Sequence, residues 1–261
     1  MLLPILILLV TIITAAGFIT QRWWFPAPIN EYASWFDSYF AINLILTGAI
    51  FIAAQLAFVW AILRFRNRGN PVRYSHGNNR LEIFWTIATL VLFVGAAFAG
   101  SRLWSDVHLS ATPANALRVE VQGKQFAWNF RYAGVDGKFG RTKVQLINDA
   151  AGNPFGIDEA DPAGNDDIMS SELRVPAGRP IELKMRSPDV LHNFFVRELR
   201  IKQDLVPGME IPLRFRADKP GAYEIACSEL CGLGHHQMRS VLVVLPPETF
   251  ETWLKDKAAE K

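Results

Sequence analysis

Cysteine is scarce in this chain of 261 residues, which contains only Cys227 and Cys231. Two cysteines allow at most one bridge, so the chain is not a small protein built on a disulfide framework. The pattern Cys-x-x-Cys-His is absent, which excludes a covalently attached c-type haem. The net charge of +2 indicates neither a nucleic-acid-binding surface nor a site for an acidic substrate.

Charge is missing altogether from three long apolar runs, at residues 2–20, 39–63 and 83–101. About 18 to 20 such residues cross the roughly 30 Å hydrocarbon core of a bilayer as a helix. The second and third runs lack the polar face of a helix in a soluble core, so both are predicted to span a membrane. Residues 1–20 have no basic segment before the apolar run but contain the small-residue sequence Thr14-Ala15-Ala16. They form either a third helix, the interpretation favoured here, or a cleaved signal-like segment.

Orientation follows from the loop inside the predicted transmembrane hairpin of residues 21–105. This loop holds five basic residues and no acidic one, namely Arg64, Arg66, Arg68, Arg73 and Arg80. The positive-inside rule places such a loop in the cytoplasm, so everything after residue 101 is expected on the outer side. Residues 21–38 are dense in Trp and Phe and are predicted to form an aromatic belt at the membrane interface.

From about Ala116 onward, short runs of the sequence alternate between apolar and polar residues, a period of two residues. Alternating runs predict strands at residues 126–132, 143–147, 172–175, 181–185, 193–201, 211–216, 222–226 and 239–245. Gly and Pro turn signals separate them, which predicts an antiparallel sandwich or barrel over residues 106–246. Residues 247–261 predict a short polar helix. The carboxylate-rich residues 137–170 are either a solvated loop or a docking surface for a basic partner.

Residue types that bind metals are concentrated in residues 227–238, which read C-S-E-L-C-G-L-G-H-H-Q-M. Two thiolates, an imidazole and a thioether suit copper better than a hard cation. A disulfide would leave His235 and Met238 without a role. A zinc site would leave Met238 unexplained, because zinc is bound by cysteine, histidine and carboxylate ligands. A mononuclear blue-copper site with His192 would leave Cys227 unused. A two-copper site uses them all: both thiolates bridge the metals, each metal takes one histidine, and Met238 and a backbone carbonyl complete the ends.

With this motif the sequence resembles subunit II of the haem–copper oxygen reductases, the CuA-bearing subunit of cytochrome c oxidase. The similarity runs from the second apolar run to Trp253. Four further motifs carry it, L-E-I-F-W-T at 81–86, G-K-Q-F-A-W at 123–128, D-V-L-H-N-F-F-V at 189–196 and R-I-K-Q-D-L-V-P-G at 200–208. The resemblance implies N-terminal transmembrane α-helices followed by an all-β cupredoxin-like Greek-key sandwich.

The resemblance also implies a ligand set for two copper ions. Its members are His192, Cys227, Cys231, His235, Met238 and the backbone carbonyl of Glu229. The Glu229 carboxylate would in addition hold a magnesium ion at the boundary with subunit I.

Three other side chains take roles only by resemblance. Phe126 stands where the family usually has the tryptophan that receives the electron, and Trp128 follows two residues later. Glu82 would mark the start of a proton path into subunit I, although a helix-end glutamate facing water is equally consistent.

The implied function is that of the electron-accepting subunit of a proton-translocating terminal oxidase in a bacterial inner membrane, with its copper domain on the periplasmic side. Electrons would pass from a cytochrome c-type donor to haem in subunit I, which reduces oxygen. The expected partners are subunit I, other oxidase subunits, the donor and membrane lipid, with no nucleic acid. Alternatives are the CuA subunit of a nitric-oxide-reductase type enzyme and a membrane-tethered copper-binding or assembly protein. A copper-free quinol oxidase subunit would have a degraded ligand set, whereas this one is complete.

Overall fold

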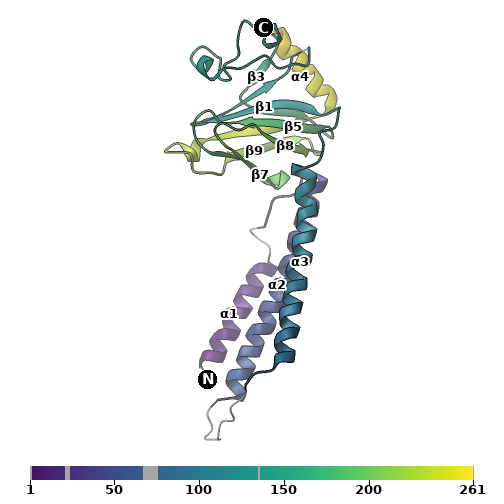
Figure 1. Cartoon of the computed structure of the whole chain (residues 1–261), viewed down its shortest axis with the longest axis vertical. Coiled ribbons are helices and arrows are strands. Elements are labelled where there is room, and N and C mark those ends of the chain that lie inside the picture. The colour runs from purple at the N-terminus through teal and green to yellow at the C-terminus, as the bar shows by residue number, and fades with distance from the viewer. Residues whose placement is uncertain (1, 21–23, 67–75, 135, 261) are drawn as a thin grey trace. The chain divides into compact units, whose positions relative to one another are not determined.

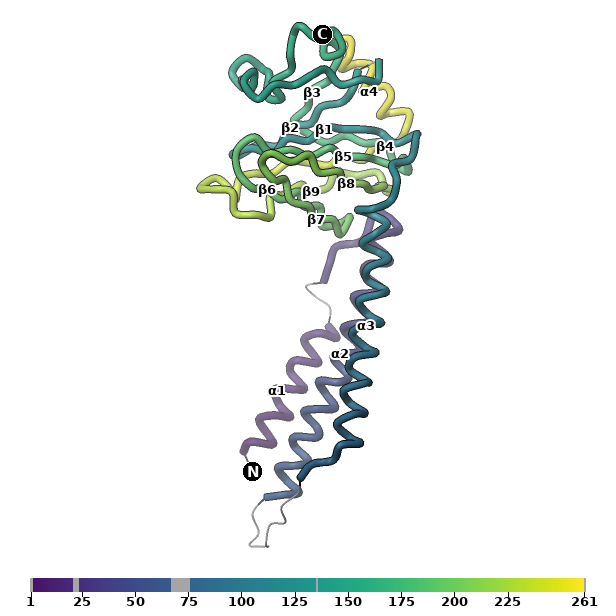
Figure 2. Tube along the Cα trace, viewed as in Figure 1, coloured from purple at the N-terminus to yellow at the C-terminus, as the bar shows by residue number. Residues whose placement is uncertain are grey.

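A computed structural model describes residues 2–20, 24–66, 76–134 and 136–260. Three long helices come first, α1 at Leu2–Ile19, α2 at Glu31–Arg64 and α3 at Asn79–His108. Each is long and apolar enough to cross a membrane, which confirms the predicted helices, the N-terminal one included. The three run side by side (Figure 2), and the Tyr39 hydroxyl of α2 donates a hydrogen bond of 2.9 Å to the Ala96 carbonyl of α3.

The start of α2 corrects the prediction of an interfacial linker over residues 21–38. The Asn30 side chain accepts a hydrogen bond of 2.8 Å from the Ala33 N–H and so caps the helix. Trp35 and Phe36 therefore lie in α2 rather than in a linker. Within the predicted arginine loop, Arg68 and Arg73 lie outside the described residues.

The described residues contain ten strands in two five-stranded sheets, ordered β3-β2-β1-β5-β8 and β4-β10-β9-β6-β7. Figure 1 shows the sandwich that they form. The strands are β1 Leu117–Lys124, β2 Ala127–Tyr132, β3 Ile168–Ser170, β4 Leu173–Pro176, β5 Pro180–Arg186, β6 His192–Val196, β7 Ile201–Leu205, β8 Ile211–Arg216, β9 Gly221–Cys227 and β10 Arg239–Leu245. The C-terminal helix α4 spans Pro247–Ala259. Four short 3-10 helices complete the elements, η1 Val144–Leu146, η2 Pro162–Gly164, η3 Arg197–Leu199 and η4 His235–Gln237. The expected cupredoxin-like sandwich is confirmed, and β8 and β10 have the predicted bounds.

The prediction of a purely antiparallel arrangement is wrong for two strand pairs. β1 pairs in parallel with β5, and β4 pairs in parallel with β10. Parallel neighbours need a crossover connection. Here the chain passes to the opposite sheet between the two members of each pair, as in a Greek key, so the second strand returns in the same direction as the first.

Two predicted strands are also corrected. Residues 143–147 form η1 instead of a strand, because only isolated bridges flank them, Thr142 to Ile157 and Asn148 to Asn153. The run at 193–201 divides into β6, η3 and β7, since Arg200 adopts a left-handed conformation with φ of 57°. Strands β1 and β3 were not predicted individually.

The core lies between the two sheets. Its fully buried members include Val119, Phe130, Leu183, Phe194 and Leu242, one each from β1, β2, β5, β6 and β10. Residues 25–34 belong to the same compact unit as residues 104–261. The side chain of Asn30 donates a hydrogen bond of 2.8 Å to the Arg216 carbonyl at the end of β8, which ties this short stretch to the sandwich.

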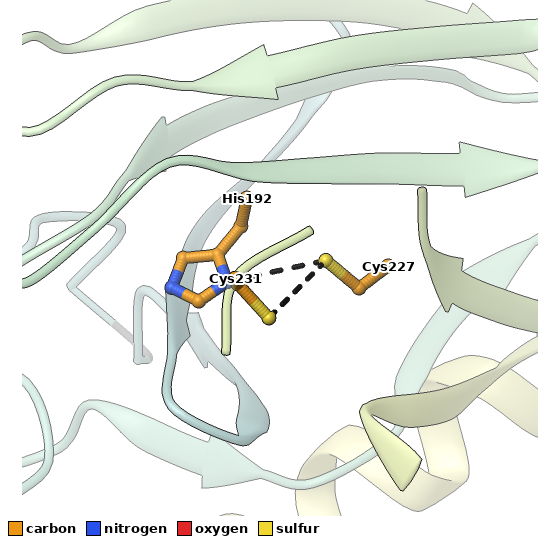
Figure 3. Close-up of side chains that lie close together, drawn as sticks. All are labelled: His192, Cys227 and Cys231. Carbon is orange, nitrogen blue, oxygen red and sulfur yellow. Dashed lines mark hydrogen bonds between the residues drawn. The ribbon is translucent and has the colours of Figure 1, made fainter. Parts of the chain in front are cut away.

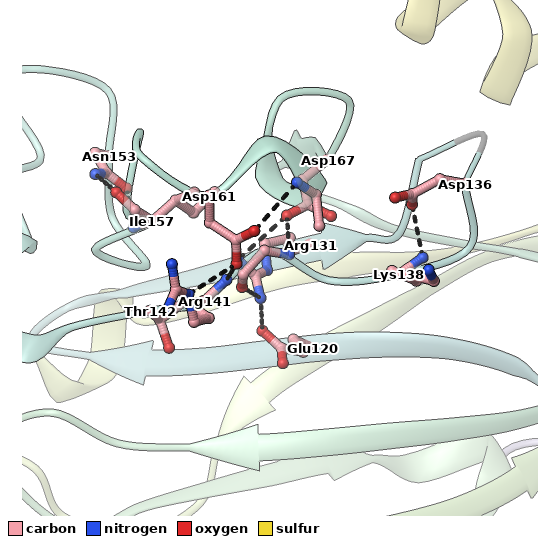
Figure 4. Close-up of polar contacts among 12 residues, drawn as sticks. Glu120, Arg131, Asp136, Lys138, Arg141, Thr142, Asn153, Ile157, Asp161 and Asp167 are labelled. Carbon is pink, nitrogen blue, oxygen red and sulfur yellow. Dashed lines mark hydrogen bonds and ion pairs between the residues drawn. The ribbon is translucent and has the colours of Figure 1, made fainter.

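The acid-rich segment, residues 137–170, is anchored to the sandwich through Arg131 of β2 (Figure 4). The Arg131 guanidinium is 1% exposed and lies 2.7 Å from the Glu120 carboxylate and 3.3 Å from that of Asp167. It donates a hydrogen bond of 3.0 Å to the Gly140 carbonyl. Burial raises the pKa of Asp167, while the Gly140 N–H and Arg131 oppose that rise.

Most other carboxylates of the acid-rich segment also have cationic partners. Asp158 lies 2.8 Å from the Lys143 ammonium, and Asp161 lies 3.1 Å from the Arg141 guanidinium. The hydrogen bond from Lys143 lowers the pKa of Asp158, and the Arg141 N–H lowers that of Asp161. This pairing favours the interpretation of the segment as a folded surface loop over that of an unbalanced acidic docking surface.

Candidate metal centre

Two neighbouring strands place the predicted metal ligands at one end of the second sheet. His192 begins β6 and Cys227 ends β9, and the two strands pair in antiparallel register through Phe194 and Cys227. The ligand loop, residues 228–238, then returns through η4 to β10. The Cys227 N–H donates to the Met238 carbonyl at 3.1 Å and so closes this loop at its base.

The two thiols face each other across the loop (Figure 3). Their sulfur atoms lie 3.9 Å apart, and both cysteines are buried and unbridged. A disulfide holds its sulfurs at about 2.0 Å. The two cysteines are therefore available as two separate sulfur donors.

Each cysteine lies beside one histidine. His192 Nδ1 is 4.0 Å from the Cys227 sulfur, and His235 Nδ1 is 3.6 Å from the Cys231 sulfur. Both thiols and His192 are buried, and their donor atoms lie within 4.8 Å of one another. His235 is half-buried. Each of the two imidazoles therefore places a nitrogen near a different one of the two sulfur atoms.

The remaining two predicted donors also divide between the cysteines. The Met238 sulfur lies 3.8 Å from the Cys231 sulfur, and the Glu229 carbonyl accepts a hydrogen bond of 3.2 Å from the Cys227 thiol. The structure thus brings all six predicted ligand residues into one cluster, with a histidine and one weaker donor near each sulfur.

The Cys231 thiol must lose its proton before it can bind a metal. Burial raises the pKa of this thiol to about 11, and the neighbouring Cys227 adds to this rise. Metal binding here therefore displaces a thiol proton and should weaken as the pH falls. Two thiolates, two imidazoles and a thioether are soft to borderline ligands, so the donor set fits copper.

The glycines of the ligand loop are explained by close packing. Gly232 has φ of +138°, and a Cβ added there would lie 2.8 Å from the side-chain nitrogen of Gln125. A Cβ on Gly234 would lie 2.5 Å from the Phe126 ring. Side chains at either position would push the ligand loop away from residues 125–126, which explains the spacing C-G-L-G.

The two predicted electron-accepting residues occupy different environments. Phe126 is 39% exposed and its ring lies over Gly232 and Gly234. Trp128 is only 3% exposed and packs edge-on against His192, with ring centroids 6.4 Å apart, and against Phe194, at 5.7 Å. Only Phe126 is therefore positioned to touch a docked protein, whereas Trp128 contacts a predicted ligand from within the core.

The predicted magnesium and proton-path residues are both exposed. The side chain of Glu229 lies on the surface of the ligand loop. Glu82 lies in the first turn of α3, which belongs to the other compact unit of the chain. Neither side chain lies in the cluster of buried donors.

Sequence reasoning missed two residues that contact the cluster without offering it a ligand. Asp189 accepts a hydrogen bond of 2.9 Å from His192 Nε2, and the Gln125 side chain donates one of 2.5 Å to the Cys231 carbonyl. Burial alone would raise the pKa of Asp189, but hydrogen bonds from the Gln125 N–H and His192 lower it overall. Both residues stand inside motifs used above, yet only tertiary contacts reveal what they touch.

Comparison with known proteins identifies relatives of this chain. Residues 117–245 match the family model described as cytochrome c oxidase subunit II, periplasmic domain. The alternative cytochrome c oxidase subunit 2 of Bradyrhizobium diazoefficiens is 32% identical over 260 residues, which cover 98% of this chain and 92% of the relative.

Two further similarities are more distant. Cytochrome c oxidase subunit 2 of Cereibacter sphaeroides is 28% identical over 240 residues, covering 88% of this chain and 77% of the relative. The crystal structure of the periplasmic domain of subunit II of cytochrome oxidase from Bradyrhizobium japonicum is 25% identical with a TM-score of 0.42, covering 57% of this chain and 99% of that domain. On the family model and the nearly full-length relative, the chain belongs to the cytochrome c oxidase subunit II family.

Proposed function

We propose that this chain is the electron-accepting subunit of a haem–copper terminal oxidase, which takes electrons from a c-type cytochrome at a two-copper centre and passes them to haem in subunit I. As a member of its family the chain is part of an oxidoreductase. The observation that carries the proposal is the single cluster of two unbridged thiols with two imidazoles, a thioether and a carbonyl around them.

The residues of the cluster would bind the metals in different ways. Cys227 and Cys231 would bridge them, His192 and His235 would each bind one, and Met238 and the Glu229 carbonyl would complete the two ends. Held by these residues, the metals would supply one-electron transfer. The burial of both thiols and of His192 keeps water away, and packing of the loop against Phe126 limits its movement.

An apolar surface beside the cluster would receive the donor. The ligand-loop apolar surface consists of Phe126, Leu230 and Leu233, and the two leucines are 77% and 98% exposed. Exposed large apolar side chains next to a redox site favour docking by contact of uncharged faces. Since most carboxylates of the acid-rich segment are paired with cations of this chain, we propose that this surface, with Phe126 at its edge, is where electrons arrive and that Trp128 lies on the route inward.

The membrane orientation, and the roles outside the copper cluster, are part of the same proposal. Arg64 and Arg66 near the end of α2 and Arg80 at the start of α3 would lie on the cytoplasmic side of a bacterial inner membrane, with the sandwich in the periplasm. Glu82, one turn from that end of α3, would open a proton path into subunit I. The Glu229 carboxylate would hold magnesium at the subunit I boundary.

The test is electron acceptance by the full-length chain in detergent. Copper-loaded chain is mixed in a stopped-flow instrument with a reduced c-type cytochrome, and the copper-free chain is the control. The proposal predicts oxidation of one cytochrome per chain by the loaded form and none by the control. Oxidation of two cytochromes per chain, or of none, would overturn it.

A further inference from the structure

The two ligand-bearing segments, residues 189–192 and 227–238, are connected through a residue that offers no metal ligand. Gln125 lies in the turn between β1 and β2 and contacts both of them. We propose that Gln125 is a positioning residue, which holds the Cys231 side of the cluster at a fixed place relative to the His192 side. The inference rests on the proposed copper binding and names a determinant of it.

Gln125 makes one hydrogen bond to each segment. Its backbone N–H donates to Asp189 Oδ2 at 2.7 Å, and its side-chain amide donates to the Cys231 carbonyl at 2.5 Å. A carbonyl oxygen can only accept, so the amide must present its NH2 group to Cys231. The side-chain amide also lies directly against Gly232, where an added Cβ would be 2.8 Å away.

Asp189 carries the restraint from Gln125 to His192. Its Oδ1 accepts hydrogen bonds from the Val190 N–H at 2.7 Å, from the Ser187 hydroxyl at 3.2 Å and from His192 Nε2 at 2.9 Å. With Nε2 directed at this carboxylate, Nδ1 is the ring nitrogen of His192 that faces Cys227. A carboxylate behind a ligating histidine fixes its tautomer and ring orientation.

The chain of contacts therefore runs from the Cys231 carbonyl through Gln125 and Asp189 to His192. Cys231, Gln125 and Asp189 are far apart in sequence. Without Gln125 the ligand loop would be tied to this part of the chain by the pairing of β6 with β9 and by the Ser228 N–H, which donates to the Asn193 carbonyl at 3.1 Å. A cluster that holds two metals needs its donors fixed to within about 0.5 Å, which local loop geometry alone rarely achieves. We infer that the side-chain amide of Gln125 supplies this precision.

The test compares Gln125→Glu and Gln125→Met in the full-length chain with the control Gln203→Glu. Both Gln125 variants keep the backbone N–H to Asp189 and the approximate size of the side chain, but neither can donate to the Cys231 carbonyl. Gln203 of β7 reaches only toward the carbonyl of its neighbour Asp204, at 3.4 Å. Copper affinity, copper hyperfine splitting by EPR and the thermal midpoint of the metal-free chain are measured for each.

The proposal predicts that Gln125→Met weakens copper binding roughly 10- to 100-fold, as for other residues that orient metal ligands. It also predicts altered hyperfine splitting, a larger loss in Gln125→Glu, and wild-type behaviour of the control. Wild-type affinity and spectrum in both Gln125 variants would overturn the inference. A lower thermal midpoint with an unchanged spectrum of the bound copper would also overturn it, because a merely structural role predicts that result. Absence of copper from the wild-type chain would instead refute the proposed function.

Discussion

Two loop regions of the sandwich domain concentrate polar side chains in opposite ways. In the acid-rich segment, Asp158, Asp161 and Asp167 each lie beside a lysine or arginine of the same chain. At the ligand loop, the thiol of Cys227 at the end of β9 lies beside Cys231, and Cys231 lies beside His235 and Met238, with separations of 3.6 to 3.9 Å. The carboxylates of the acid-rich segment thus have cations of the same chain beside them, whereas the donors at the ligand loop lie together without a cation.

The difference separates a structural role from a binding role. A buried carboxylate with an arginine partner needs nothing from outside the chain. Buried sulfur and nitrogen donors that converge without a cation are arranged for one that comes from solution. Substitutions in the acid-rich segment are therefore expected to change stability and leave copper binding intact, whereas substitutions around the ligand loop are expected to weaken copper binding.

The largest expected effect concerns Arg131. Replacing it with leucine leaves the carboxylates of Glu120 and Asp167 buried without their cation, so the free energy of unfolding should fall by about 3–5 kcal/mol. Copper bound per folded chain should stay unchanged. Urea denaturation followed by near-UV circular dichroism measures the first quantity, and metal analysis of the folded protein measures the second.

A matched control is Arg118→Leu, which removes an arginine that is 61% exposed and lies 3.4 Å from Glu182. The Glu182 carboxylate is buried but keeps the Arg214 guanidinium 3.4 Å away, so loss of the exposed Arg118 should cost only about 1 kcal/mol or less. Equal stability of the two arginine variants would contradict the assignment of Arg131 as the anchor of the acid-rich segment.

An intermediate effect is expected from Gly234→Ala in the ligand loop. The new methyl group would lie 2.5 Å from the Phe126 ring, and overpacking of this kind typically costs about 1–3 kcal/mol. Relief of the clash should displace the ligand loop and weaken copper binding, measured by competition with a copper chelator. Gly95→Ala in α3, where an added Cβ meets nothing within 4 Å, is the control.

A second substitution sharpens this prediction. Phe126→Ala removes the ring that the added methyl group meets, so Phe126→Ala combined with Gly234→Ala should recover most of the copper affinity that Gly234→Ala loses. Wild-type affinity in Gly234→Ala alone would show that the ligand loop is not held by contact with Phe126.

The smallest expected effect is the pH dependence of the acid-rich segment. The pKa values of Asp158 and Asp161 are held below the ordinary 3.8 by Lys143 and by the Arg141 N–H. A depressed carboxyl pKa contributes stability that is fully present above the unfolded value and is lost as pH falls through the folded value. Hydrogen exchange at residues 141–161 should therefore accelerate only below about pH 3.8, before the sheets open.

Lys143→Met should move the onset of this acceleration toward the ordinary carboxyl pKa, because Asp158 loses its hydrogen-bonded partner. An onset at the same pH in this variant would show that Lys143 does not set the titration of Asp158.

Sequence patterns predicted much of this architecture because local physics decides it. The uncharged runs correspond to α1 to α3, and the predicted bounds of β8 and β10 match the structure. The prediction failed where tertiary structure decides the outcome. Residues 143–147 alternate like a strand but have no ladder to join, and the run at 193–201 is broken by the left-handed Arg200.

The candidate site shows the same division. Its soft donors could be recognised from their spacing within residues 227–238, since one loop carries four of them. Gln125 and Asp189 could not, because their contacts to the cluster depend on the turn between β1 and β2 and the segment before β6 coming together. Their residue types, an amide and a carboxylate, also carry no preference for copper.

The most direct test of the account is a count of the metal on this polypeptide. The full-length chain is purified under reducing conditions, loaded with copper, freed of excess metal, and analysed for copper and protein, with an EPR spectrum of the same sample. The account predicts two coppers per chain and a mixed-valence spectrum in which one unpaired electron is shared between them. A single copper with a blue-copper spectrum, or a metal-free chain with Cys227 and Cys231 bonded to each other, would contradict it.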